Sequence, residues 1–148
     1  MTTKGVGSVS PNLANAQGVL PALNSPTYGM QLLFVLRSAD LHVTTDQQFT
    51  KVFAGTNYVV TNIIAARKTG AASVTCVGGI YTAAAKGGDA LVAATQSWVT
   101  LAGNIIVSAT LAAVAGTAIE SATPYLTLTT GSTAACTADF FIYGVCID

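Results

Sequence analysis

The chain has 148 residues, of which 51% are hydrophobic and 8% are charged, and its six Lys and Arg balance its six Asp and Glu. This composition excludes a disordered chain, because disordered chains are highly charged and poor in apolar residues. It also excludes a nucleic-acid partner, because so few scattered basic residues form no stripe for phosphates. We therefore expect one folded domain, needing no metal or disulfide, whose weakly charged surface is partly covered by neighbouring protein.

The first 29 residues differ in composition from the rest of the chain. They hold three of the four prolines, spaced among glycines, a pattern incompatible with a long helix or a central strand. We interpret residues 1–29 as an extended N-terminal arm that packs on its own domain or on a neighbour, with a frayed tail as the alternative. The apolar residues of the arm are the candidate interface: Val6, Val9, Leu13, Leu20, Leu23 and Tyr28.

Four strands are predicted in the first half of the remaining chain, at residues 30–37, 47–53, 58–67 and 72–83. The third is especially rich in β-branched side chains, which suit a pleated surface. The cluster Ser38-Ala39-Asp40 is expected to end the first strand, and a glycine turn at 68–71 to join the last two in a hairpin. The pair Gly78-Gly79 predicts a bulge or a close backbone approach.

Four further strands are predicted after a loop centred on 85–89, at residues 97–101, 105–111, 124–130 and 138–148. The sequence Ala102-Gly103-Asn104 favours a hairpin between the first two. Residues 112–122 are Ala-rich and fit either a short helix or a loop. In 124–130 the side chains alternate, with Leu126 and Leu128 on one face. Both faces of 138–148 are apolar, so we expect this strand to be central and covered on both sides.

About eight strands with short turns and no long helix predict an all-β domain over residues 30–148. The predicted fold is an antiparallel two-sheet sandwich, jelly-roll-like, with the extended arm at residues 1–29. A closed small barrel is the second candidate.

Residues that carry chemistry are few and do not form a catalytic pattern. Ser38, Asp40 and His42 share one face of a strand, but side chains along one strand stand in parallel and cannot form a Ser–His–Asp relay. The three cysteines have no CxxC spacing, and we expect buried, reduced thiols. No catalytic residue, cofactor site or metal site is predicted, and the chain is not expected to be an enzyme.

Two features of the sequence point to other functions. Residues 90–119 are uncharged and long enough to cross a bilayer, but polar residues interrupt the apolar run, and no export signal precedes them. No membrane partner is therefore expected. Trp98 with Tyr81 and Tyr125 would suit a sugar-stacking platform, although packing in the core is the commoner role of such rings.

Two long runs carry a resemblance to a known class of protein. The runs GGIYTAAAKGGDALVAATQSWVTL (78–101) and TPYLTLTTGSTAACTADFFIYGVCID (123–148) resemble segments of small virion structural proteins of tailed bacteriophages. The likeness covers about residues 30–148 and lies in the placement of Gly, Thr and Tyr.

The resemblance implies a head decoration or cement protein, with a β-sandwich or jelly-roll core and a trimeric state. Such a protein is made and assembled in the host cytoplasm and sits on the capsid exterior. There it binds the major capsid protein and stabilises the shell. A tail or head-fibre component, or a carbohydrate-binding sandwich used in host attachment, is the alternative.

Overall fold

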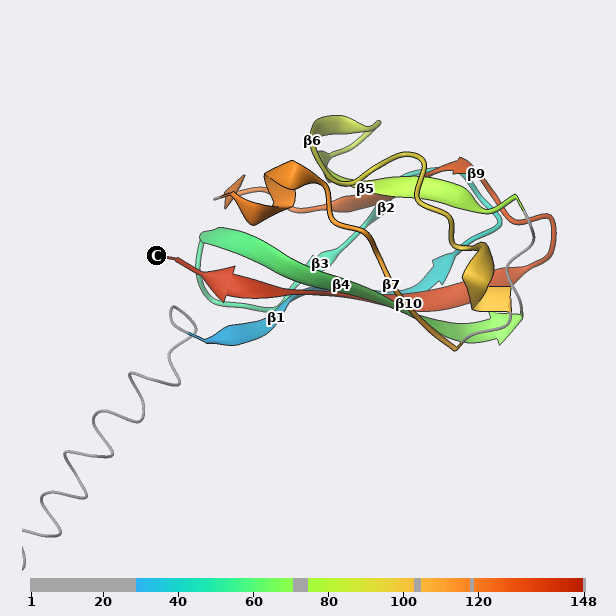
Figure 1. Cartoon of the computed structure of the whole chain (residues 1–148), viewed down its shortest axis with the longest axis horizontal. Coiled ribbons are helices and arrows are strands. Elements are labelled where there is room, and N and C mark those ends of the chain that lie inside the picture. The colour runs from blue at the N-terminus through green and yellow to red at the C-terminus, as the bar shows by residue number, and fades with distance from the viewer. Residues whose placement is uncertain (1–28, 71–74, 103–104, 118, 148) are drawn as a thin grey trace, which may run out of the picture.

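The computed structural model describes residues 29–70, 75–102, 105–117 and 119–147 (Figure 1). The predicted N-terminal arm lies outside these residues, apart from Gly29. The elements are β1 (Met30–Asp40), β2 (Gln47–Gln48), β3 (Thr50–Lys51), β4 (Asn57–Gly70), β5 (Val77–Ala83), β6 (Gly87–Val92), η1 (Val99–Ala102), β7 (Ile106–Ser108), η2 (Ala113–Gly116), β8 (Ile119–Glu120), β9 (Tyr125–Thr130) and β10 (Cys136–Cys146).

The strands form two antiparallel sheets packed as a sandwich, which confirms the predicted fold class (Figure 1). The larger sheet has the order β3-β1-β10-β4-β7, with β8 paired to β4, and the smaller has the order β2-β9-β5-β6. Without the short strands β3 and β8, eight strands remain, and their order is 1-8-3-6 in one sheet and 2-7-4-5 in the other. This is the order of a jelly roll, in which first and last strands pair.

The segment around Phe49 crosses from one sheet to the other. It was predicted as a single strand at 47–53, but β2 pairs with β9 in the smaller sheet and β3 pairs with β1 in the larger. Phe49 lies between the two pairings, and its side chain is buried and packs edge-on against Phe140. The crossing therefore places an aromatic ring between the layers, where a continuous strand would have stayed in one sheet.

The core lies between the sheets, and β10 runs through the middle of it. Alternate residues of β10 are buried along its whole length, because the strand has β1 on one side and β4 on the other. Phe140 of this strand packs edge-on against Trp98, and Phe34 of β1 packs edge-on against Tyr58 of β4. These four rings are the largest fully buried side chains of the described residues, and they fill the core.

The glycine pair in β5 behaves as predicted. The β5–β9 register shifts between Val77 and Gly78. A Cβ atom on Gly78 would lie 2.4 Å from the Cα of Leu128, and one on Gly79 would lie 2.5 Å from the carbonyl oxygen of Val92. Only glycine permits these close approaches of neighbouring backbones.

Both predicted hairpins are wrong. Residues 72–83 were expected to pair with 58–67, but β5 lies in the smaller sheet and β4 in the larger. Residues 97–101 and 105–111 were expected to pair with each other, but η1 contains 99–102 and β7 pairs with β4. The hairpin between neighbouring long strands is β5–β6, at the predicted loop 85–89.

The structure also differs from the prediction at the end of the first strand and in residues 112–122. The Ser38-Ala39-Asp40 cluster does not end β1, because Ser38 takes a positive φ of 53° and the pairing with β10 resumes at Ala39. Residues 112–122 contain both η2 and β8, so the short-helix alternative holds for part of the segment.

Candidate functional site

The candidate site is the outer face of the larger sheet, which points away from the smaller sheet. Antiparallel pairing of β1, β10 and β4 aligns its side chains in rows across the strands. Figure 1 shows the smaller sheet on one side of β1, β10 and β4 and no described element on the other. We call this surface the outer face and define it by ten residues: Met30, Leu32, Val35, Val59, Ile64, Ala66, Ile106, Phe141, Tyr143 and Val145.

Two aromatic rows form the middle of the outer face. In one, Val35 of β1, Phe141 of β10 and Ile64 of β4 lie side by side. In the next, Tyr143 lies between Leu32 and Asn62. Side chains directly opposite each other on neighbouring strands are about 5 Å apart at Cβ, so the two rows form an apolar surface that only Asn62, on β4, interrupts.

The ends of the outer face carry its most exposed residues. Met30 pairs with Val145 at one end and is 70% exposed. Ile106 pairs with Ala66 at the other end and is 61% exposed. Large apolar side chains at this exposure, next to an apolar surface, are typical of a protein contact.

Two bulges keep the outer face in register. The β1–β10 pairing shifts between Leu32 and Phe34, so that Leu33 and Phe34 both enter the core. The β4–β10 pairing shifts opposite Tyr143 and Gly144, at Thr61. Each extra residue restores the alternation, so that apolar residues before and after the bulge share the outer face.

A charged cluster marks one end of the outer face. Arg37 Nη1 donates to Asp139 Oδ2 at 3.1 Å, and its guanidinium carbon lies 4.8 Å from the centre of the Phe141 ring. The backbone N–H of Ser38 donates to Asp139 Oδ1 at 2.7 Å, and Lys68 Nζ donates to Ser38 Oγ at 2.6 Å. Burial raises the pKa of Asp139, but the Ser38 N–H, Arg37 and Lys68 together hold it below its ordinary value. The cluster therefore holds its carboxylate ionised and paired.

The sequence signal for the outer face lies in residues 138–148, whose two apolar faces were expected to be covered on both sides. The inner face is buried, whereas Phe141, Tyr143 and Val145 are half-buried, and Arg37 lies over the Phe141 ring. The predicted interface residues Val6, Val9, Leu13, Leu20, Leu23 and Tyr28 lie outside the described residues.

The Ser38, Asp40 and His42 trio does not converge. The hydroxyl of Ser38 is bonded to Lys68, and Asp40 Oδ1 accepts the backbone N–H of its neighbour His42 at 2.8 Å. The His42 ring, which is exposed, places Nδ1 2.6 Å from the carbonyl oxygen of Ser132. The arrangement is that of a capped turn and offers no nucleophile–base contact.

The three aromatic residues weighed as a sugar platform do not form one. Trp98 is fully buried, and its Nε1 donates to the carbonyl oxygen of Gly78 at 3.1 Å. Tyr81 is also buried, and Tyr125 receives a hydrogen bond from Gln48. Sugar stacking requires an exposed ring face, which Trp98 lacks.

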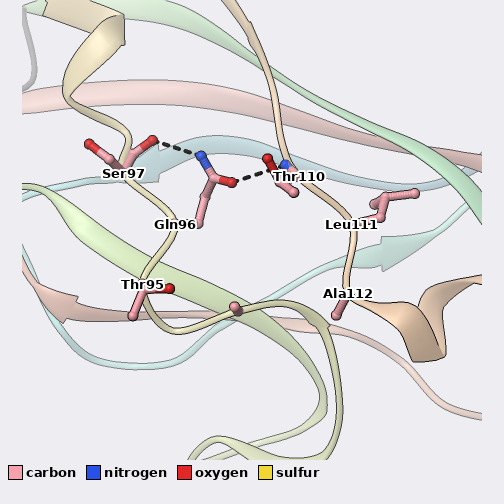
Figure 2. A pocket seen from close by; sticks show the side chains of 7 residues that line it. Thr95, Gln96, Ser97, Thr110, Leu111 and Ala112 are labelled. Carbon is pink, nitrogen blue, oxygen red and sulfur yellow. Dashed lines mark hydrogen bonds between the residues drawn. The ribbon is translucent and has the colours of Figure 1, made fainter.

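An open pocket lies between residues 93–97 and 110–112 (Figure 2). Gln96 spans it, since its Nε2 donates to the Ser97 carbonyl at 2.8 Å and its Oε1 accepts the Thr110 N–H at 3.0 Å. The lining residues are Ala, Thr, Gln, Ser and Leu. With both ends of the Gln96 amide engaged and no titratable side chain in the lining, the pocket has no group for acid–base chemistry.

The three cysteines are buried, and none of them is in a disulfide, as predicted. Burial raises the pKa of the Cys76 thiol to about 11, and the neighbouring Cys136 adds to the rise. Within the described parts of the chain, no three His, Cys, Asp or Glu side chains form a group able to hold a metal ion. No helix among the described residues is long and apolar enough to cross a membrane.

Comparisons with protein-family models, with curated proteins and with solved structures found no match for this chain.

Proposed function

We propose that this chain is a non-enzymatic structural subunit of a phage virion, which binds the outer surface of the capsid shell as a homotrimer and stabilises it. The observation that carries the proposal is the outer face, a sheet surface with an apolar centre over which no described strand or helix lies. A protein with such a surface functions by contact with other protein.

The composition supports the same function. With 8% charged residues and no net charge, the chain has little electrostatic repulsion between copies. The resemblance of residues 78–101 and 123–148 to phage virion proteins supports the choice of the capsid as the assembly. The major capsid protein is the partner that this resemblance indicates.

Weak contacts suffice for such a role when they are repeated by symmetry. A trimer that engages three equivalent sites on a shell makes its second and third contacts at high effective concentration. The avidity of the trimer then exceeds the affinity of any one contact, and a closed cyclic assembly leaves no open end for fibres to grow.

The test is to add the purified chain to virions that lack it. We expect saturable binding at a copy number that follows the shell symmetry, and shells that release their DNA at a higher temperature. Virions that already carry the chain are the matched control and should bind no more of it. Unsaturable or absent binding to the depleted shells would contradict the proposal.

A further inference from the structure

The outer face approaches the dimensions of a small subunit interface. β1 and β10 have 11 residues each, and β7 has 3. At about 3.3 Å per residue and about 4.8 Å between strands, the four strands β1, β10, β4 and β7 span roughly 36 Å by 14 Å at their widest. That is at most roughly 500 Å² per copy, or roughly 1,000 Å² for two copies, which is the lower limit for a specific protein–protein interface.

The residue types at its centre are those of an interface core. Phe141 and Tyr143 occupy the middle strand, flanked by the aliphatic side chains Val35, Leu32 and Ile64. Aromatic residues in the middle of a patch, surrounded by apolar neighbours, provide most of the energy of known interfaces. Polar groups lie at the margins, where a rim would remain in contact with water.

The charges of the outer face permit contact with an identical surface. Asp139 is neutralised within the same subunit by Arg37, at one end of the face. Lys68 reaches the same end through its bond to Ser38, whereas the rows of Phe141, Tyr143 and Val145 hold no charged side chain among the described residues. Two copies that meet through these three rows would therefore bury no ion.

We propose that the outer face is the contact between copies of this chain, and that its occupant is a second copy. The inference rests on the proposed structural role but names a different partner from the shell. A weakly charged, preformed sheet surface is best matched by an equally uncharged one, and the chain itself supplies that surface at every encounter. Sheet-on-sheet contact between two such faces follows the packing already used inside the sandwich and joins copies in two-fold pairs, so the trimer of the proposed function would use a second contact.

The experiment compares two matched variants of the full chain. Tyr143→Arg places a charge at the centre of the outer face, and Tyr125→Arg makes the same change on β9 of the smaller sheet. Mass is measured by size-exclusion chromatography with light scattering across a dilution series. The wild type and Tyr125→Arg should be oligomers of the 14.9 kDa chain, whereas Tyr143→Arg should dissociate at least roughly thirty-fold more readily, the loss typical of an aromatic hot spot.

A double variant tests whether dissociation is caused by the change of the outer face and not by misfolding. Val35→Thr with Ile64→Thr keeps β-branched shapes in the sheet while adding hydroxyls to the outer face. This double variant should also dissociate, with an unchanged far-ultraviolet circular dichroism spectrum. Because the contact is apolar, moderate salt should not weaken the wild-type oligomer.

The inference would be overturned if the wild type were monomeric at every concentration, or if the oligomer survived both outer-face variants. It would also be overturned by a monomer in which a photo-cross-linker at Tyr143 captures residues 1–28 of the same chain, because the N-terminal arm would then be the occupant of the outer face. A monomer that still binds depleted shells would remove this inference and the trimeric state but keep the shell-binding part of the proposed function, whereas an oligomer that ignores shells would remove shell binding and keep this inference.

Discussion

At the scale of single residues, the turn between β5 and β6 contains the clearest backbone strain. Ala85 and Lys86 have φ angles of 55° and 61°, and the Gly87 N–H donates to the Ala84 carbonyl across them. Two central residues with positive φ match a type I′ hairpin turn, for which Asn-Gly is the preferred pair. L residues with a Cβ atom pay roughly 1 kcal/mol for this conformation.

Replacing the pair should therefore stabilise the protein. We expect Ala85→Asn with Lys86→Gly to raise the free energy of unfolding by about 1 kcal/mol, measured by urea denaturation. Lys86→Ala is the control, because it removes the bond from Lys86 Nζ to Thr129 Oγ1 but keeps the Cβ atom. Equal stability of all three proteins would show that the turn is not strained.

Asp139 makes the stability of the folded protein depend on pH in the acidic range. The pKa of its carboxyl is lower in the folded state than its ordinary value, although burial acts in the opposite direction, because Ser38, Arg37 and Lys68 favour the ionised form. Its contribution to stability is thus fully present above the unfolded pKa of about 4 and is lost as the pH falls through the folded-state pKa.

The stability difference between wild type and Asp139→Asn should accordingly be largest at neutral pH and shrink below about pH 4. Urea titrations at a series of pH values measure it. Asp89→Asn, which removes a carboxylate from exposed β6, controls for the loss of one negative charge. A difference that stays constant with pH would mean that Asp139 does not make these contacts.

At the scale of elements, Gly144 allows β10 to sit between two bulged strands. A Cβ atom there would lie 2.0 Å from the carbonyl oxygen of Val59 and 2.7 Å from Cδ1 of Leu33. Leu33 is the extra residue of the β1 bulge, and the β4 pairing shifts at the same level. The two bulges and Gly144 therefore lie together, and they bend the larger sheet at the position of Gly144, which has no side chain.

Gly144→Ala should disturb this bend. We expect a loss of about 2 kcal/mol or more of unfolding free energy, since the closest atom belongs to backbone that cannot move without breaking the ladder. Val145→Ala, one residue along on the outer face, should cost much less. The pair can be compared by thermal denaturation, and similar melting temperatures would rule out the close approach.

Strand positions followed from residue pattern, whereas strand partners did not. The β-branched run of β4, the alternation of Leu126 and Leu128 and the apolar β10 all lie in strands where expected. Pairing neighbours in sequence failed because, in the jelly-roll order, β5 and β6 are the consecutive strands that share a sheet and a ladder. No local signal tells a turn from a crossing between sheets, as the split at Phe49 illustrates.

The candidate site shows a similar division. The sequence revealed that Phe141, Tyr143 and Val145 form an apolar stripe, because alternation alone assigns them to one face. It could not reveal that the described chain leaves this face open, since that depends on what lies above it. The rows with Val35 and Ile64 became visible only with the register of three strands.

At the scale of the whole molecule, the thiols report on global unfolding. Cys76, Cys136 and Cys146 lie in the core, and a pKa of about 11 leaves roughly one part in ten thousand of Cys76 as thiolate at pH 7. We expect a thiol-specific reagent such as Ellman's to react slowly with the native protein and with all three cysteines at once in denaturant. Fast reaction of a single native thiol would indicate local opening around it.

The crossing at Phe49 determines how the two layers can separate. Because β2 and β3 are one residue apart and belong to different sheets, the covalent chain joins the layers along that edge. On the opposite edge the chain passes from β6 to β7 through the much longer segment 93–105, and a bridge between Val92 and Leu111 and the amide of Gln96 connect neighbouring segments. Local separation of the two sheets should therefore admit water first at the edge near Gln96. The edge near Phe49 should stay closed until the protein unfolds globally.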